Sequence, residues 1–186
     1  MNQQAKYQNT TLPILKYGDT ILRQKVKDIT DFSNLRIFID QMFGTMYEEG
    51  GVGLAANQVG KSINLMVLDL GNLKDKSKTS DPQVFINSQI VNMEGSSIVE
   101  EGCLSIPDIR AEIKRPEIIT LRYQDENKNQ YENIYSGFIS RVLQHEMDHL
   151  KGKLFIDYLT PAKRMLIKKR LLEISKSGQP STGIIL

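Results

Sequence analysis

The sequence predicts an α+β fold in which mostly antiparallel sheets wrap around one buried helix, with a further helix at the C-terminus. Three observations favour this class. Strand-like apolar runs occupy the middle of the chain, helical periodicity occurs before and after them, and no internal repeat or linker divides the sequence. A chain of 186 residues suits a single domain with one core, so we expect residues 1–186 to form one domain.

The first predicted helix lies in the N-terminal third of the chain. Its apolar residues recur at helical spacing, and they are Leu35, Phe38, Ile39, Met42, Phe43 and Met46. Asp31 or Ser33 is available as N-cap, and Gly50-Gly51 ends the run. We expect the methionines to be core residues.

Strands follow in the middle of the chain. The segments Ile63 to Leu70 and Val84 to Met93 are typical of strands, and the first is apolar enough to be buried. Between them, Gly71 to Gln83 is polar and predicts a solvated loop. Ile118 to Tyr123 and Gln130 to Tyr135 predict a hairpin around a polar turn.

Two helices are predicted after the hairpin. The first begins after Ser136-Gly137 and ends near Gly152. The second has Thr160 as N-cap and Pro161 at its first position. Between positions 163 and 176 it carries six basic residues and one acidic residue, which is typical of a solvated helix. We expect the tail, residues 177–186, to be mobile.

Composition and charge are those of an ordinary globular protein, with 40% hydrophobic and 25% charged residues. A net charge of +2 implies no attraction of the whole protein to nucleic acid or membrane. One cysteine cannot form an internal disulfide, which is consistent with a reducing compartment. The polar N-terminus predicts no secretory signal, and no stretch reaches the ~18 apolar residues of a membrane span. We therefore expect a cytoplasmic bacterial protein.

The only two histidines, His145 and His149, stand four residues apart in the segment HEMDH, and Glu146 follows the first. A step of four residues turns a helix through about 400° and advances it by about 6 Å, so both imidazoles leave the same face. Glu146 is rotated by about 100° from His145, so it can contact a water without being a ligand. This arrangement is typical of zinc hydrolases, in which one helix carries two ligands and a general base.

The alternative is that the two histidines only pack or face solvent, because HExxH also occurs by chance in surface helices. Two histidines placed at random fall four apart about once in a hundred trials, so the spacing favours a metal site. A catalytic site of this kind needs a third protein ligand. The chain has no third histidine, which leaves a carboxylate or the single cysteine, Cys103.

Cys103 lies in EGCLSIP, residues 101–107, which is typical of a strand end that runs into a turn. A free cysteine is most often a small buried hydrophobe. A thiolate, however, is a strong ligand for zinc or ferrous iron. The preceding Gly102 would also let a ligand or a substrate backbone approach closely.

Three separated segments together resemble peptide deformylase: GVGLAANQ (Gly51 to Gln58), EGCLS (Glu101 to Ser105) and QHEMDH (Gln144 to His149). Each segment is short, but their order and separation in a chain of this size make a specific signature. The resemblance extends from KYGDTILR (Lys16 to Arg23) through the C-terminal helix.

The resemblance implies a metal-dependent hydrolase that removes the formyl group from N-terminal N-formylmethionine of newly synthesised proteins and releases formate. It implies one divalent metal ion, with Fe²⁺ in the cell and Zn²⁺, Ni²⁺ or Co²⁺ possible in preparations. The implied ligands are Cys103, His145 and His149. By the same resemblance, Glu146 moves a proton from water to the leaving amine. The implied donors to the negatively charged oxygen are the side-chain amide of Gln58 and the backbone N–H of Leu104.

The substrate implied by the family is an N-formyl-methionyl nascent peptide. Val52-Gly53 and Gly102 offer extended backbone on either side of a cleft, where a peptide could pair as an added strand. We expect the methionine pocket to be lined by Phe138, Arg141 and Val142. For Arg141, we expect the stem to pack while the charge stays in water. The resemblance also implies that the basic C-terminal helix could contact the ribosome.

Two rival functions remain at this point. One is a metalloprotease that cuts internal peptide bonds, for which a carboxylate such as Glu101 would replace Cys103 as third ligand. The other is a deformylase-like protein kept for binding alone. The presence of Glu146 argues against the second, because binding would not require that carboxylate.

Overall fold

The computed structural model describes residue 7, residues 11–72 and residues 81–177. The α-helices in these segments are α1 (Leu35–Glu48), α2 (Gly137–Leu150) and α3 (Pro161–Ser177). The strands are β1 (Gly53–Ala55), β2 (Leu65–Leu68), β3 (Gln83–Glu94), β4 (Ser97–Cys103), β5 (Ile106–Arg115), β6 (Ile118–Gln124) and β7 (Gln130–Ser136). Short 3₁₀ helices include η3 (Ala56–Val59) and η5 (Phe155–Tyr158).

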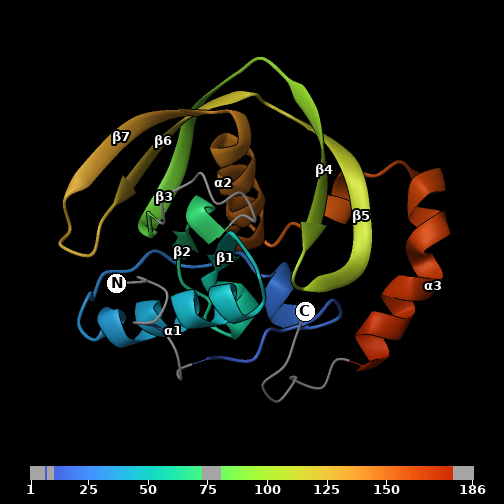
Figure 1. Ribbon diagram of the computed structural model, residues 1–186, viewed down its shortest axis with the longest axis horizontal. Coiled ribbons are helices and arrows are strands. Elements are labelled where there is room, and N and C mark those ends of the chain that lie inside the picture. The colour runs from blue at the N-terminus through green and yellow to red at the C-terminus, as the bar shows by residue number, and fades with distance from the viewer. Residues whose placement is uncertain (1–6, 8–10, 73–80, 178–186) are drawn as a thin grey trace.

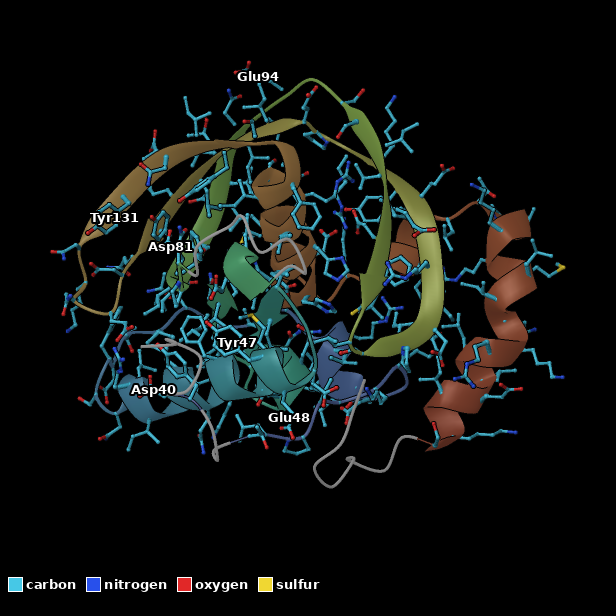
Figure 2. All side chains as sticks on the ribbon, viewed as in Figure 1. Asp40, Tyr47, Glu48, Asp81, Glu94 and Tyr131 are labelled. Atoms are coloured by element: carbon cyan, nitrogen blue, oxygen red, sulfur yellow. The ribbon has the colours of Figure 1, made fainter. Side chains whose placement is uncertain are left out.

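Two antiparallel sheets flank helix α2 (Figure 1). The larger sheet has the strand order β1-β2-β3-β6-β7, and every neighbouring pair in it is antiparallel. The smaller sheet pairs β4 with β5. Asp81 stands just before β3 and Glu94 lies at the far end of that strand, on the opposite side of the molecule from Glu48 of α1 (Figure 2). The predicted class, antiparallel sheets around a buried helix, is confirmed.

Strand β2 joins two apolar layers of the core. Leu65 and Val67 belong to the cluster with α1, whereas Met66 and Leu68 belong to the cluster with α2. Because successive side chains point to opposite faces, a strand covered on both faces must be apolar throughout. This explains the unbroken apolar run in the sequence. The ordered strand is shorter than the predicted segment, and a 3₁₀ turn begins at Leu70.

Helix α2 is buried along most of its length although its sequence is polar. The eleven residues 140–150 are all buried, and they include both histidines. Its apolar side chains Val142, Leu143, Met147 and Leu150 pack on the larger sheet. A buried helix with this many polar groups requires partners for them, and those partners form the site described below.

Several predicted elements are confirmed. Strand β3 and the β6–β7 hairpin lie where the apolar patterns placed them. Strand β4 ends at Cys103, and residues 104–105 form the expected turn. Helix α3 begins at Pro161, and the backbone N–H of Lys163 donates to Thr160 Oγ1 at 3.3 Å, as expected for an N-cap.

The N-cap of α1 differs from the prediction, and strand β5 was not predicted at all. Neither Asp31 nor Ser33 caps α1: the N-cap is Asn34 at φ 64°, and the Asp31 carboxylate accepts from the Ser33 N–H in a turn before the helix. Strand β5 was not predicted, because charged residues interrupt its apolar positions.

Other predictions fall wholly or partly outside the described residues. Most of the loop between β2 and β3, residues 73–80, is one of these, and residues 178–186 of the tail are the other. Among the helices that are described, none is long and apolar enough to cross a membrane.

Candidate metal centre

Among the described residues, Cys103 at the end of β4 lies close to both histidines of α2. One ligand atom from each of the three residues lies within 4.8 Å of the others. Cys103 Sγ lies 3.2 Å from His149 Nε2, and the two imidazole centroids are 5.1 Å apart. A thiolate and two imidazoles are donors that zinc and ferrous iron both accept. The three donors therefore fit one divalent ion, and they are the three that the sequence predicted.

The two histidines have different electrostatic surroundings. Burial lowers the pKa of His145, but hydrogen bonds with Cys103 and Glu101 outweigh it, so this pKa lies well above its ordinary value. For His149, burial and the charge of His145 hold the pKa well below its ordinary value. A lowered pKa favours the neutral imidazole at His149, which is the form that ligates a metal.

Glu101 contacts the Nδ1 atom of the His145 imidazole. Its Oε2 lies 3.0 Å from His145 Nδ1, and it accepts from Arg115 Nη2 at 2.9 Å. Its Oε1 accepts from Arg115 Nε at 2.6 Å and from Arg141 Nη1 at 3.0 Å. Burial raises the pKa of Glu101, but the hydrogen bonds from His145 and Arg115 outweigh it and lower the pKa to about 2.

This carboxylate is therefore an anion that two guanidinium groups already engage, and it orients the imidazole as second-layer carboxylates do in metal sites. Glu101 does not belong to the ligand group. This geometry argues against the rival hypothesis that Glu101 replaces Cys103 as the third ligand, which a metalloprotease would require.

The expectation that the Arg141 charge stays in water is also wrong. Arg141 is only 4% exposed, and besides Glu101 its guanidinium donates to the carbonyl oxygens of Ile113 and Ser97 and to the Ser97 hydroxyl. The guanidinium is buried because these acceptors, which lie on β4 and β5, satisfy its donors. Arg141 still lines the cleft.

Glu146 lies beside the ligand group without belonging to it. It is buried, and its Oε2 has no hydrogen-bond partner among the described residues. Burial is the largest influence on this carboxyl group, and it raises the pKa to about 7. Gly53 of β1 faces the same carboxyl: a Cβ at this position would lie 2.8 Å from Glu146 Oε1.

The two residues that carry the predicted oxyanion donors, Gln58 and Leu104, line the same cleft. Gln58 Oε1 accepts from the Ala55 N–H at 2.8 Å, which fixes the side chain. Gln58 Nε2 then donates to Ser105 Oγ at 3.2 Å and points toward Cys103 Sγ at 3.7 Å. Leu104, whose N–H is the second predicted donor, follows Cys103 directly and also lines the cleft.

The cleft has a volume of about 540 Å³ and contains every predicted pocket residue. These residues come from β1, β4 and α2 and the segments beside them, and they are Val52, Gly53, Gly102, Phe138, Arg141 and Val142. Gln58, Cys103, His145 and Glu146 line the same cleft. The structure thus brings these predicted residues together around one cleft, whereas His149 adjoins Cys103 without lining the cleft.

Sequence reasoning missed four side chains that support the site. Asn57 Nδ2 donates to the His149 carbonyl at 2.6 Å, and Ser105 receives Gln58. Arg115 binds Glu101, and Lys16 Nζ donates to the Leu104 carbonyl at 2.8 Å. Asn57, Ser105 and Lys16 lie within the segments that carried the family resemblance, so those segments were a signal that could have found them. Arg115 lies in β5, where no pattern marked it.

The fold and the site together define a class: a hydrolase with a Cys/His/His metal centre and a buried carboxylate beside it. Comparison with known proteins narrows this class. The family model for polypeptide deformylase matches residues 11–165. The chain belongs to the polypeptide deformylase family, whose members are metal-dependent hydrolases that remove the N-formyl group from nascent peptides.

Relatives and solved structures agree. Peptide deformylase 2 of Xanthomonas campestris pv. campestris is 43% identical over 169 residues, which cover 89% of this chain and 96% of that protein. Peptide deformylase of Chlorobium phaeovibrioides is 42% identical over 168 residues, covering 90% and 88%. The crystal structure of a peptide deformylase from Legionella pneumophila matches with a TM-score of 0.81 at 37% identity, covering 90% and 96%. Membership in this family of enzymes also argues against a protein kept for binding alone.

Proposed function

We propose that Cys103, His145 and His149 hold one divalent metal ion and that Glu146 is the proton carrier of the deformylase reaction. The observation that carries this assignment is the position of Glu146: a buried carboxyl with an unpartnered oxygen lies in the cleft, next to the three donors but outside their group. A carboxyl that serves only structure would be paired when buried.

The ion, when bound, supplies Lewis-acid chemistry, since it polarises a carbonyl oxygen and makes water more acidic. Glu146 takes the proton from the attacking water and delivers it to the leaving amine nitrogen, so that one group acts first as base and then as acid. Its desolvated position favours this exchange, because neither protonation state of Glu146 is strongly preferred near neutral pH.

Gln58 Nε2 and the backbone N–H of Leu104 are proposed to donate to the oxygen of the tetrahedral intermediate. The Gln58 side chain is already held by the Ala55 N–H and aimed toward Cys103 and Ser105. A donor that is fixed before the reaction costs no reorganisation when charge develops.

The peptide part of the substrate is proposed to pair with the backbone at Val52-Gly53 on one side and Gly102 on the other, as an added strand. The methionine side chain would contact Phe138, Val142 and the apolar stem of Arg141. The buried guanidinium of Arg141 faces Glu101, so it does not present charge to the methionine.

We propose ferrous iron as the metal in the cell. A Cys/His/His site accepts zinc by affinity, while the family resemblance favours iron. The test is formate release from an N-formylmethionyl tripeptide by iron, nickel, cobalt and zinc forms prepared without oxygen, with metal per chain measured in the same samples. The iron, nickel and cobalt forms should turn over faster than the zinc form. Equal turnover of fully loaded iron and zinc forms would contradict the proposal.

Three further points complete the proposed function. Residues 1–186 form one catalytic domain, and the support for this is that each described core cluster includes a residue that lines the same cleft. The enzyme works in the bacterial cytoplasm, where nascent N-formylmethionyl chains are made. Helix α3 contacts the ribosome through its exposed basic residues, because RNA phosphates attract such a surface.

A further inference from the structure

A short segment near the N-terminus binds backbone carbonyls of both residues that carry the proposed oxyanion donors, Gln58 and Leu104. The Leu15 N–H donates to the Gln58 carbonyl at 2.8 Å, and the Tyr17 N–H donates to the Ser105 carbonyl at 2.8 Å. Between them, Lys16 Nζ donates to the Leu104 carbonyl at 2.8 Å. Three consecutive residues thus tie the 3₁₀ helix that carries Gln58 to the turn that carries Leu104.

Lys16 is unusual because it is a lysine with little exposed surface. The residue is 9% exposed, and burial is the main cause that lowers its pKa to about 8, against the opposing influence of Glu49, Cys103 and Asp108. Lysine is rarely buried, because the desolvation of an ammonium group is costly. An apolar residue would serve better at this position if the segment only had to fill space.

The carbonyl that Lys16 holds belongs to the residue whose own N–H is the proposed donor. The direction of the Leu104 N–H depends on the backbone torsions of the turn between β4 and β5. Lys16 and Tyr17 fix the two carbonyls that follow this N–H, and β4 fixes Cys103 before it. The Ser105 hydroxyl, in the same turn, accepts from Gln58 Nε2.

We propose that Lys16 is a positioning residue for the deformylase reaction, and that through the Leu104 carbonyl it holds the turn so that the Leu104 N–H and the Gln58 amide point at one oxygen. This inference rests on the proposed function. Stabilisation of a developing oxyanion depends on donors that are fixed in advance. A displacement of about 1 Å can cost up to about 10²-fold in rate. Lys16 does not touch the substrate and acts only through the turn.

The test replaces Lys16 by Met, which keeps the length and apolar stem but removes the donor. Oxyanion donors act mainly in the transition state, so kcat should fall about tenfold while KM stays the same. Metal per chain should also be unchanged. Lys16→Arg should recover most of the loss, because a guanidinium N–H can donate to the same carbonyl.

Arg23→Met is the matched control. Arg23 lies on the same N-terminal segment but pairs with Asp157 of η5, away from the donors. This variant should lose some thermal stability and keep the parental kcat. If Lys16→Met does not fold, Lys16→Gln takes its place, since the shorter side chain cannot reach the carbonyl and should give the same fall in kcat.

A double variant distinguishes positioning from a general loss of stability. If Lys16 acts on the oxyanion donors, its effect should shrink in a Gln58→Ala background, since one of the two donors that it aligns is already gone. If the two substitutions act independently, the double variant's fall in kcat will equal the product of the two single falls, and that result would overturn the inference. So would a folded Lys16→Met protein with parental kcat, or one in which only KM changes. A parental protein that released no formate would instead overturn the proposed function, and the inference with it.

Discussion

Helices α2 and α3 have similar lengths and both carry many polar residues, yet they differ sharply in environment. Helix α2 buries eleven consecutive residues, whereas α3 buries only Leu171 and Ile174. On α3 the apolar residue Leu166 is 85% exposed, and Lys168 and Lys169 lie in solvent. Figure 1 shows α2 between the two sheets and α3 at the outer edge of the molecule.

Polar residues on a helix therefore indicate a functional site only when they are also buried. On α2, a polar group that lost its partner would be left desolvated, so each change should have a large and specific effect. On α3, water replaces any lost partner, and changes should have small effects on the chemistry. Variants of both helices and of the residues around α2 test this contrast, and we expect their effects on turnover to decrease in the order given.

The largest effect should come from the ligands. His149→Ala and Cys103→Ala should each lose the metal and with it nearly all turnover, because two remaining donors hold a divalent ion weakly. Metal per chain after dialysis and formate release are the measurements. A His149→Ala protein that kept a full metal complement would show that the Cys/His/His group is not the site.

Gln58→Ala should have the next largest effect, a fall in kcat of about 10²–10³ with the metal retained, because one oxyanion donor is removed. Formate release measured over a range of substrate concentrations separates kcat from KM. An unchanged kcat together with a raised KM would mean that Gln58 binds the substrate and does not act in the transition state.

Gly53→Ala should act on α2 from the neighbouring strand. The added Cβ would approach Val142 Cγ1 at 2.7 Å and Glu146 Oε1 at 2.8 Å, so the carboxyl must move. We expect kcat to fall by about one to two orders of magnitude with metal retained. Gly95→Ala is the control: it strains a backbone at φ 66° in the turn after β3 and should lower Tm without changing kcat. Parental kcat for Gly53→Ala would show that the site tolerates a displaced Glu146.

The smallest effect on chemistry should come from α3. Charge reversal at Lys168 and Lys169 should change formate release from a free tripeptide by less than about twofold, since both side chains are solvated. Ribosome binding, measured by co-sedimentation at several salt concentrations, should weaken and lose part of its salt dependence. A large fall in turnover on the free tripeptide would break the contrast between the two helices.

The sequence predicted the parts of the site that depend on local spacing. The four-residue step between His145 and His149 places both imidazoles on one face of α2. The same helix geometry places Glu146, which directly follows His145, beside the ligands but not among them. Cys103 and Gln58 were found through the motifs that resemble the family. The fold class was predicted as well, because the apolar run of β2 and the strand-like segments of β3 and the hairpin can be recognised in the sequence.

The contacts between distant segments could not be predicted. Arg141 was expected to reach water because its partners, Glu101 and the carbonyls of Ser97 and Ile113, lie on strands whose position no local pattern encodes. The role of Lys16 depends on a contact with Leu104, 88 positions away. The N-cap of α1 was misplaced because Asp31 is an equally good residue for a turn, which is how the chain uses it.

Replacement of Glu146 by Ala tests whether α2 carries two metal ligands and a separate proton carrier. We expect the purified Glu146→Ala protein to keep one metal ion per chain, while kcat for formate release falls by about 10²–10⁴ or more. Metal content and formate release should be measured on the same sample. A Glu146→Ala protein that loses its metal, or that releases formate at nearly the parental rate, would contradict this assignment of roles.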